Sequence, residues 1–88
     1  MDKYKPISCE LYGMYEMAIL RREPLRISWH GARGQDHVEA LRLTNLRTRQ
    51  HAEYMIAYNH FGERRVIRLD RVREAVPVHE SSLRHRRH

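Results

Sequence analysis

The chain of 88 residues predicts a mainly β fold, in which one N-terminal helix is followed by five short antiparallel strands that bend into a small barrel. Three observations support this prediction. Apolar residues recur at helical spacing over residues 9–21, the spacing changes to strict alternation after Pro24, and turn-forming residues then interrupt the alternation at short intervals. A chain of this length forms one domain and buries too little for a deep cleft beside a large core, so we expect a surface-acting module.

The predicted helix covers residues 9–21 and follows an extended N-terminal arm, residues 1–8. Ser8 suits the N-cap position, because its hydroxyl can accept a hydrogen bond from a free N–H of the first turn. One side of the helix is apolar, through Leu11, Met14, Tyr15, Ala18 and Ile19. Met17 and Leu20 lie on the other side, which makes that side a second candidate contact surface.

Five strands are predicted between about residues 25 and 76, namely 25–29, 37–43, 52–59, 64–69 and 72–76. In the second of them the alternation slips between Ala40 and Leu41, which predicts a bulge or a strong bend. The stretch 44–51 is polar and predicts a loop. The third strand is apolar on both faces, so we expect it inside the sheet.

The fourth strand is expected to direct Ile67 and Leu69 inward, and Arg64 and Arg68 outward. Outward arginines have an ordinary structural role, because charged side chains keep exposed strands soluble and block edge pairing. Asp70 follows this strand, and we expect its carboxylate to order the turn through a local bond to the backbone.

This order of elements is typical of an Sm-like (SH3-like) bent five-stranded antiparallel barrel, with a β-sandwich as the alternative. The single domain is expected to cover residues 9–78. Residues 79–88 are rich in Arg, His and Ser and predict a basic, disordered tail.

The net charge of +6 is unevenly distributed along the chain. Residues 9–80 contain 12 Lys and Arg against 10 Asp and Glu, so the domain is nearly balanced and most of the excess lies in the arm and the tail. The lone Cys9 excludes an intramolecular disulfide. Because no apolar run has membrane-spanning length and no secretory signal is recognisable, we expect a cytoplasmic protein.

Catalytic and metal-binding patterns are not recognisable in the sequence. The seven histidines include no pair at the i, i+4 helical spacing, and no Cys or carboxylate joins them in a recognised ligand pattern. Cys9 has no identifiable base beside it in the sequence, so a buried, unreactive thiol is the expectation. There is no Gly-rich phosphate loop, supported acid pair or Ser-His-Asp set. We therefore expect that the protein is not an enzyme and that it binds no cofactor and no metal.

The strongest basic cluster of the domain is formed by Arg42, Arg47 and Arg49. Together with an exposed tyrosine, arginines can hold phosphates while the ring stacks on bases. The alternative is that these arginines are simply solvated. The cluster is the basis of an RNA-binding hypothesis.

Several segments also carry a family resemblance. They are Tyr4-x-Pro6-Ile7-x-Cys9-Glu10-x-Tyr12, Glu16-x-Ala18, Arg49, Glu53-Tyr54 and Gly62-Glu63-x-Arg65-x-Ile67-Arg68-Leu69-Asp70-x-Val72. In this order, from about Tyr4 to Val76, they resemble the Rof family, also called YaeO. The first and last segments are the most specific.

The resemblance implies a bacterial inhibitor of the transcription termination factor Rho, with an N-terminal helix and an Sm-like barrel similar to that of Hfq. Members of the family are understood to bind the N-terminal RNA-binding domain of Rho and to keep RNA off its primary sites. The partner-binding residues that the resemblance suggests are Glu10, Tyr12 and Glu16 of the helix and Arg49, Gln50 and His51 of the predicted loop.

Two function hypotheses follow. In the first, a single chain docks on Rho and prevents termination by steric competition with RNA. Leu11 and Gly13 stand where the family pattern has acidic residues, so Glu10 and Glu16 are the acidic groups left on the helix. In the second, a small RNA-binding module uses the arginine cluster and the basic tail. A ring oligomer, by analogy with Hfq, is a third possibility.

Overall fold

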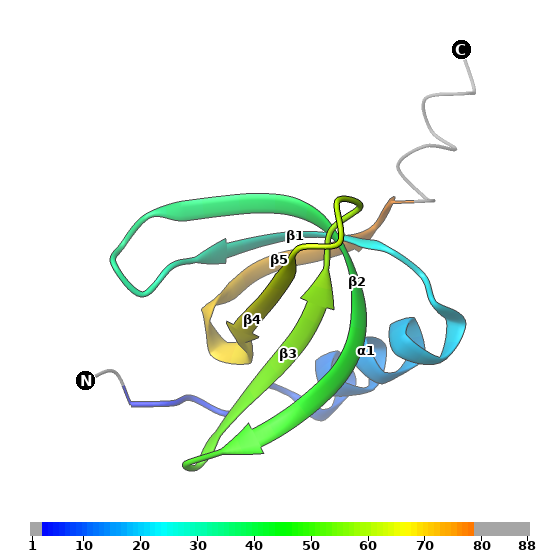
Figure 1. Ribbon diagram of the computed structural model, residues 1–88. Helices are drawn as coiled ribbons and strands as arrows, with labels where there is room; N and C mark the ends of the chain where they lie inside the picture. Colours follow the sequence, from blue (N-terminus) through cyan, green and yellow to red (C-terminus); the bar gives the residue numbers. More distant parts are fainter. Residues whose placement is uncertain (1–2, 79–88) are drawn as a thin grey trace.

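The computed structural model describes residues 3–78 (Figure 1). The helix α1 (Cys9–Arg21) precedes one five-stranded antiparallel sheet, and a short 3-10 helix, η1 (Leu69–Arg71), links the last two strands. The strands are β1 (Leu25–His30), β2 (Asp36–Arg49), β3 (Ala52–Tyr58), β4 (Arg64–Arg68) and β5 (Val72–Pro77), in the spatial order β4-β3-β2-β1-β5. The predicted barrel-like, mainly β fold with one helix is confirmed. The predicted tail lies outside the described residues.

The bounds of α1 follow from its two caps. At the start, the Ser8 hydroxyl accepts a hydrogen bond from the N–H of Leu11 at 3.1 Å, so the predicted N-cap is confirmed. At the end, Arg22 adopts a left-handed conformation with φ of 53°, and the N–H of Glu23 donates to the carbonyl of Ala18 at 3.0 Å. This closing turn satisfies carbonyl groups that the helix itself leaves free.

The long strand β2 bends the sheet into a barrel. Its first half pairs with β1 and its second half pairs with β3, and Figure 1 shows it curving along its whole length. One of the two predicted alternatives, a strong bend, is present in β2. The other, a bulge, is displaced: the register shifts between Leu43 and Asn45, and pairing is regular at Ala40 and Leu41. The alternation only seemed to slip there, because the charged Glu39 lies opposite Ile27, on the same face as the core residues.

The inward position of Glu39 is explained by a partner from a distant strand. Its carboxylate binds Arg65 of β4 through two contacts, of 2.8 Å to Nε and 3.2 Å to Nη2. Because β2 and β4 are not neighbours in the sheet, this ion pair connects the two halves of the bent sheet. A buried or half-buried charge is tolerated when it is paired in this way.

The predicted loop over residues 44–51 is also wrong, since β2 continues to Arg49 and only Gln50 and His51 form the turn. The polar residues of this stretch have low strand propensity, but their backbone pairing with β3 overrides it. Leu46 faces Met55 and packs against the core, while the backbone of the polar residues around it completes the ladder with β3.

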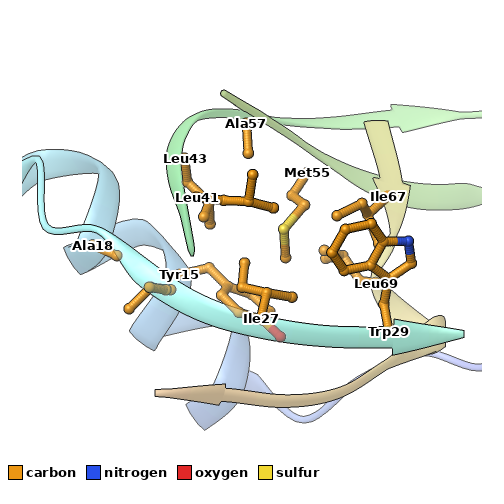
Figure 2. Close-up of a cluster of buried hydrophobic side chains, with 11 residues drawn as sticks. Tyr15, Ala18, Ile27, Trp29, Leu41, Leu43, Met55, Ala57, Ile67 and Leu69 are labelled. Atoms are coloured by element: carbon orange, nitrogen blue, oxygen red, sulfur yellow. The ribbon is translucent and has the colours of Figure 1, made fainter. Parts of the chain in front are cut away.

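The core lies between the two halves of the sheet and α1 (Figure 2). Ile67 and Leu69 are 3% and 1% exposed, so their predicted inward orientation is confirmed. Tyr15 is fully buried, and its hydroxyl has no hydrogen-bond partner within the described chain. Burial raises the pKa of Tyr15 to about 12, because an ionised ring would be poorly solvated there.

The N-terminal arm is held against the sheet by a polar cluster. The Asp70 carboxylate accepts a hydrogen bond from the backbone N–H of Lys5 at 2.9 Å and lies 2.6 Å from Nε of Arg68. The hydroxyl of Tyr4 donates to Glu53 at 2.9 Å. Arg68 lies on the predicted outward face, opposite Tyr54, but its side chain is only 14% exposed rather than solvated. The prediction for Asp70 is wrong, because its carboxylate binds a residue 65 positions away rather than its own turn.

The charge state of Asp70 reflects this environment. Burial by itself would raise the pKa of the carboxyl, but the hydrogen bonds from Arg68 and from the backbone of Lys5, with the nearby positive charges, outweigh it and lower the pKa. The carboxylate therefore remains ionised and keeps the arm in place.

Candidate protein-binding surface on helix α1

A shallow hollow of about 320 Å³ lies where α1 meets β2. We call it the helix groove, and it is lined by Tyr12, Glu16, Ile19, Leu20, Asn45 and Leu46. Tyr15 and Ala18 anchor another side of α1 in the core. Tyr12, Glu16 and Leu20 follow one another at spacings of four residues and therefore form the outer wall of the groove. The groove thus has a defined orientation on the sheet.

The chemistry of the helix groove is apolar with one carboxylate. Leu20 is 76% exposed and Met17, beside it on α1, is 42% exposed. Within residues 3–78, the side chain of Glu16 forms no hydrogen bond or ion pair with another residue. Such a surface suits a partner that brings an apolar side chain together with a basic group.

The three predicted helix residues are not equally placed. Tyr12 and Glu16 both line the groove, and Tyr12 also packs against the core cluster, so its ring has a structural role as well. Glu10 is exposed in the first turn of α1 and does not line the groove. The structure therefore brings two of the three together.

The predicted loop residues lie elsewhere. Arg49 ends β2, and Gln50 and His51 form the exposed turn to β3. Both turn residues have positive φ, of 51° and 65°, a conformation that costs a non-glycine residue roughly 1 kcal/mol or more. None of the three lines the helix groove.

The arginine cluster predicted from the sequence is extended along β2 rather than compact. Arg42 and Arg47 are both exposed and lie five positions apart along the strand, or roughly 15 Å. In the ladder with β3, Arg42 lies opposite Tyr58 and Arg47 lies opposite Tyr54. The tyrosine that the RNA-binding hypothesis needs is thus supplied by the neighbouring strand.

Four groove residues were not predicted as site residues, namely Ile19, Leu20, Asn45 and Leu46. Leu20 carried a signal, as an apolar residue on the outer side of the helix. Leu46 carried a weaker one, as the single leucine within 44–51, but the assignment of that stretch to a loop concealed it.

Three other expectations concern reactive or acidic positions. Leu11 packs against the core, which explains an apolar residue where the family pattern has an acidic one. A Cβ added at Gly13 would meet no atom within 4 Å, so no close packing explains the glycine. Cys9 is exposed, so the expectation of a buried thiol is wrong.

Residues 3–78 contain neither a metal-binding cluster nor a membrane-spanning helix. No group of three or more His, Cys, Asp or Glu side chains in this range could hold a metal ion. None of its helices has the length and apolar character needed to cross a membrane.

The chain matches no protein-family model and no curated protein. Among solved structures it is similar to Proteasome accessory factor B/C (PafBC) of Arthrobacter aurescens, with 23% sequence identity and a TM-score of 0.70. The alignment covers 84% of this chain but 12% of that chain. At this identity the likeness shows the fold alone: the arrangement of one helix and a bent antiparallel sheet also occurs within a much longer protein.

Proposed function

We propose that the protein binds the N-terminal RNA-binding domain of the transcription termination factor Rho and inhibits Rho-dependent termination by blocking RNA access. The proposal starts from the sequence resemblance to the Rof family. The observation that carries it is that Tyr12 and Glu16, two residues suggested by that resemblance, line one groove with the exposed Leu20. A partner of this kind implies that the protein acts as a single chain in the bacterial cytoplasm.

The proposed contact relies on local complementarity rather than on bulk charge. The carboxylates of Glu16 in the groove and Glu10 in the first turn of α1 each meet a basic group that otherwise binds RNA phosphate. Tyr12 and Leu20, one turn of α1 before and after Glu16, contribute apolar contact area in the groove. The inhibitor and RNA therefore compete for one surface of Rho.

The net charge of +6 gives this mechanism a distinctive dependence on salt. A cationic chain is repelled at long range by a basic RNA site, and added salt screens that repulsion. Binding to Rho should therefore be insensitive to salt or become slightly tighter, whereas RNA binding to the same site weakens steeply. Opposite salt trends for the binding of this protein to Rho and for the binding of RNA to Rho would distinguish docking by local contacts from nonspecific attraction.

The direct test is a titration of the N-terminal domain of Rho with the full chain, in the presence and absence of competing RNA. Glu16→Lys should weaken binding by about 1 to 3 kcal/mol, because it places like charges together. Glu10→Lys should have a smaller effect, since Glu10 lies outside the groove. The melting temperature should be unchanged for both exposed positions.

Leu20→Ala and Phe61→Ala form a matched pair of controls, because both side chains are 76% exposed and Phe61 does not line the groove. Only Leu20→Ala should weaken the complex with Rho. Simultaneous binding of RNA and this protein to the Rho domain, or an unchanged affinity for Glu16→Lys, would exclude the competitive mechanism.

A further inference from the structure

A second hollow, of about 540 Å³, lies just beyond the C-terminus of α1, between the α1–β1 connection and the β3–β4 turn. We call it the turn hollow, and it is lined by Arg22, Pro24, Ala40, Arg42, Tyr58, Asn59, His60 and Gly62. Figure 1 shows the α1–β1 connection and the β3–β4 turn at the same end of the sheet. It shares no lining residue with the helix groove.

The turn hollow is cationic. Arg22 and Arg42 line it, Arg64 lies opposite Tyr58 on β4, and no carboxylate is among the lining residues. Over residues 3–78, none of these three arginines forms an ion pair, whereas Arg65 on the opposite face of β4 pairs with Glu39. Positive charge that is left uncompensated around a concave surface attracts anionic ligands.

The same surface presents aromatic rings. Tyr58 lines the hollow, and the rings of His60 and Phe61 contact each other with centroids 4.0 Å apart. Phe61 is 76% exposed, which is unusual for a large apolar ring. Flat rings with open faces provide stacking surfaces for nucleobases without selecting one base.

The backbone of the turn that carries His60 and Phe61 is held by the side chain of Asn59. The side-chain oxygen of Asn59 accepts hydrogen bonds from the N–H groups of Phe61 and Glu63 at 3.0 and 2.9 Å. Its amide nitrogen donates to Glu39 and Glu63 at 2.7 and 2.9 Å. A turn held by four bonds loses little further freedom when a ligand binds, and this favours affinity.

We propose that the turn hollow, with the exposed His60–Phe61 pair, is a binding site for single-stranded nucleic acid. Arg22, Arg42 and Arg64 hold phosphates, while Tyr58 and Phe61 stack on bases. The hollow has the size of a small-ligand pocket, which accommodates a nucleotide. A duplex is disfavoured, because its base faces are covered by neighbouring pairs and only its phosphates remain available. This site goes beyond the proposed function, since none of its residues contributes to the helix groove.

The test is fluorescence anisotropy of labelled RNA and DNA single strands of about ten nucleotides, and of a duplex of the same length, with the full chain. Both single strands should bind and the duplex should bind more weakly. The two single-stranded arms show whether the 2′-hydroxyl contributes, since only RNA carries it. Absence of binding to either single strand would overturn the proposal.

Two pairs of variants distinguish the site from general attraction to a basic chain. Phe61→Ala should weaken single-strand binding roughly 5- to 100-fold by removing a stacking ring, while the equally exposed Leu20→Ala should leave it unchanged. Arg42→Gln should weaken binding and reduce the salt slope by about 0.7. Arg49→Gln removes the same charge from the same strand outside the hollow and should have a smaller effect.

Equal losses for Arg42→Gln and Arg49→Gln would mean attraction by net charge and would overturn the site. Loss of Rho binding by Phe61→Ala, with nucleic-acid binding intact, would assign this face to a protein partner instead. Because each proposal has its own exposed apolar variant, failure of one is distinguishable from failure of the other. Unchanged melting temperatures confirm that the variants are folded.

Discussion

The two turns that flank β3 solve the same problem in different ways. The β3–β4 turn, residues 59–63, is fixed by the side chain of Asn59 and uses Gly62, at φ of 81°, where a left-handed residue is needed. The β2–β3 turn has only two residues, Gln50 and His51, and both are left-handed without being glycine. The pair Asn-Gly is strongly preferred in such a two-residue turn.

The contrast shows that the β3–β4 turn is rigid, whereas the β2–β3 turn is strained. The β3–β4 turn is stabilised by hydrogen bonds and carries its aromatic pair in a fixed position. The β2–β3 turn is held by the ladder between Arg49 and Ala52, while its own residues oppose the conformation. Strain of this kind persists where the surrounding structure imposes it, and it often accompanies side chains retained for contacts.

The largest expected effect is at the rigid turn. Asn59→Ala removes two donated and two accepted hydrogen bonds at a side chain that is 7% exposed. It should lower the free energy of unfolding by about 2 to 4 kcal/mol, because several half-buried groups lose their partners. Chemical denaturation measures this loss. A loss below about 0.5 kcal/mol, the range of ordinary surface substitutions, would mean that the turn is not held by Asn59.

The strained turn should respond in the opposite direction. The double substitution Gln50→Asn with His51→Gly supplies the residues that this geometry prefers and should raise the free energy of unfolding by about 1 to 2 kcal/mol. The same denaturation experiment reports the gain. If the substitution also weakens binding to Rho while stabilising the fold, the two side chains are retained for contact; a destabilised variant would contradict the assigned strain.

A pair of glycines sharpens the comparison with a smaller effect. Gly62→Ala should destabilise the chain by about 1 kcal/mol, because its φ of 81° disfavours a side chain although a Cβ there would meet no atom within 4 Å. Gly13→Ala makes the same chemical change within α1 and should stabilise the chain by about 1 kcal/mol. Changes of the same sign in both would show that backbone conformation is not the cause.

The smallest expected effect is a response of one turn to acid. Hydrogen bonds from Arg65 and Asn59 hold the pKa of the Glu39 carboxyl below its ordinary value of 4.5. Its contribution to stability is therefore fully present above that value and is lost as the pH falls through the lower, folded-state pKa. Amide protection at Phe61 and Glu63, corrected for intrinsic exchange rates, should fall there by a few-fold.

The β2–β3 turn provides the internal control for that experiment. No carboxylate hydrogen bond supports the backbone of Gln50 and His51 among the described residues, so acid should leave the protection of the neighbouring ladder amides unchanged until the whole chain unfolds. Equal acid sensitivity at both turns would indicate global unfolding rather than a local effect of Glu39.

The sequence was sufficient for the fold wherever periodicity or local chemistry was strong. Ser8 and the apolar side of α1 defined the helix, and alternation defined Ile67 and Leu69 as core residues. It failed where a residue depends on a distant partner. Glu39 looked like a break in alternation, because its partner Arg65 is 26 positions away in the sequence. Asp70 was predicted to bind its own turn, because nothing in the sequence indicates that its partner is the backbone of Lys5.

The candidate surfaces show the same limit. Tyr12 and Glu16 could be placed together from helical spacing alone, but Leu46 could not be added until its pairing with β3 was known. Arg42 was found from charge, whereas Tyr58 and Phe61 were not connected to it, because only the ladder and the turn bring them near. Spacing within one element is readable from sequence; juxtaposition of different elements is not.

The exposed thiol at the start of α1 makes binding at the helix groove observable. Cys9 is the only cysteine of the chain, so a maleimide dye attaches at one defined position without any substitution. Along the helix axis it lies about 10 Å from Glu16 and about 20 Å from Arg22. Docking of a protein at the helix groove should therefore change the emission of the dye, while an oligonucleotide at the turn hollow should leave it nearly constant, so that the label distinguishes the first event from the second.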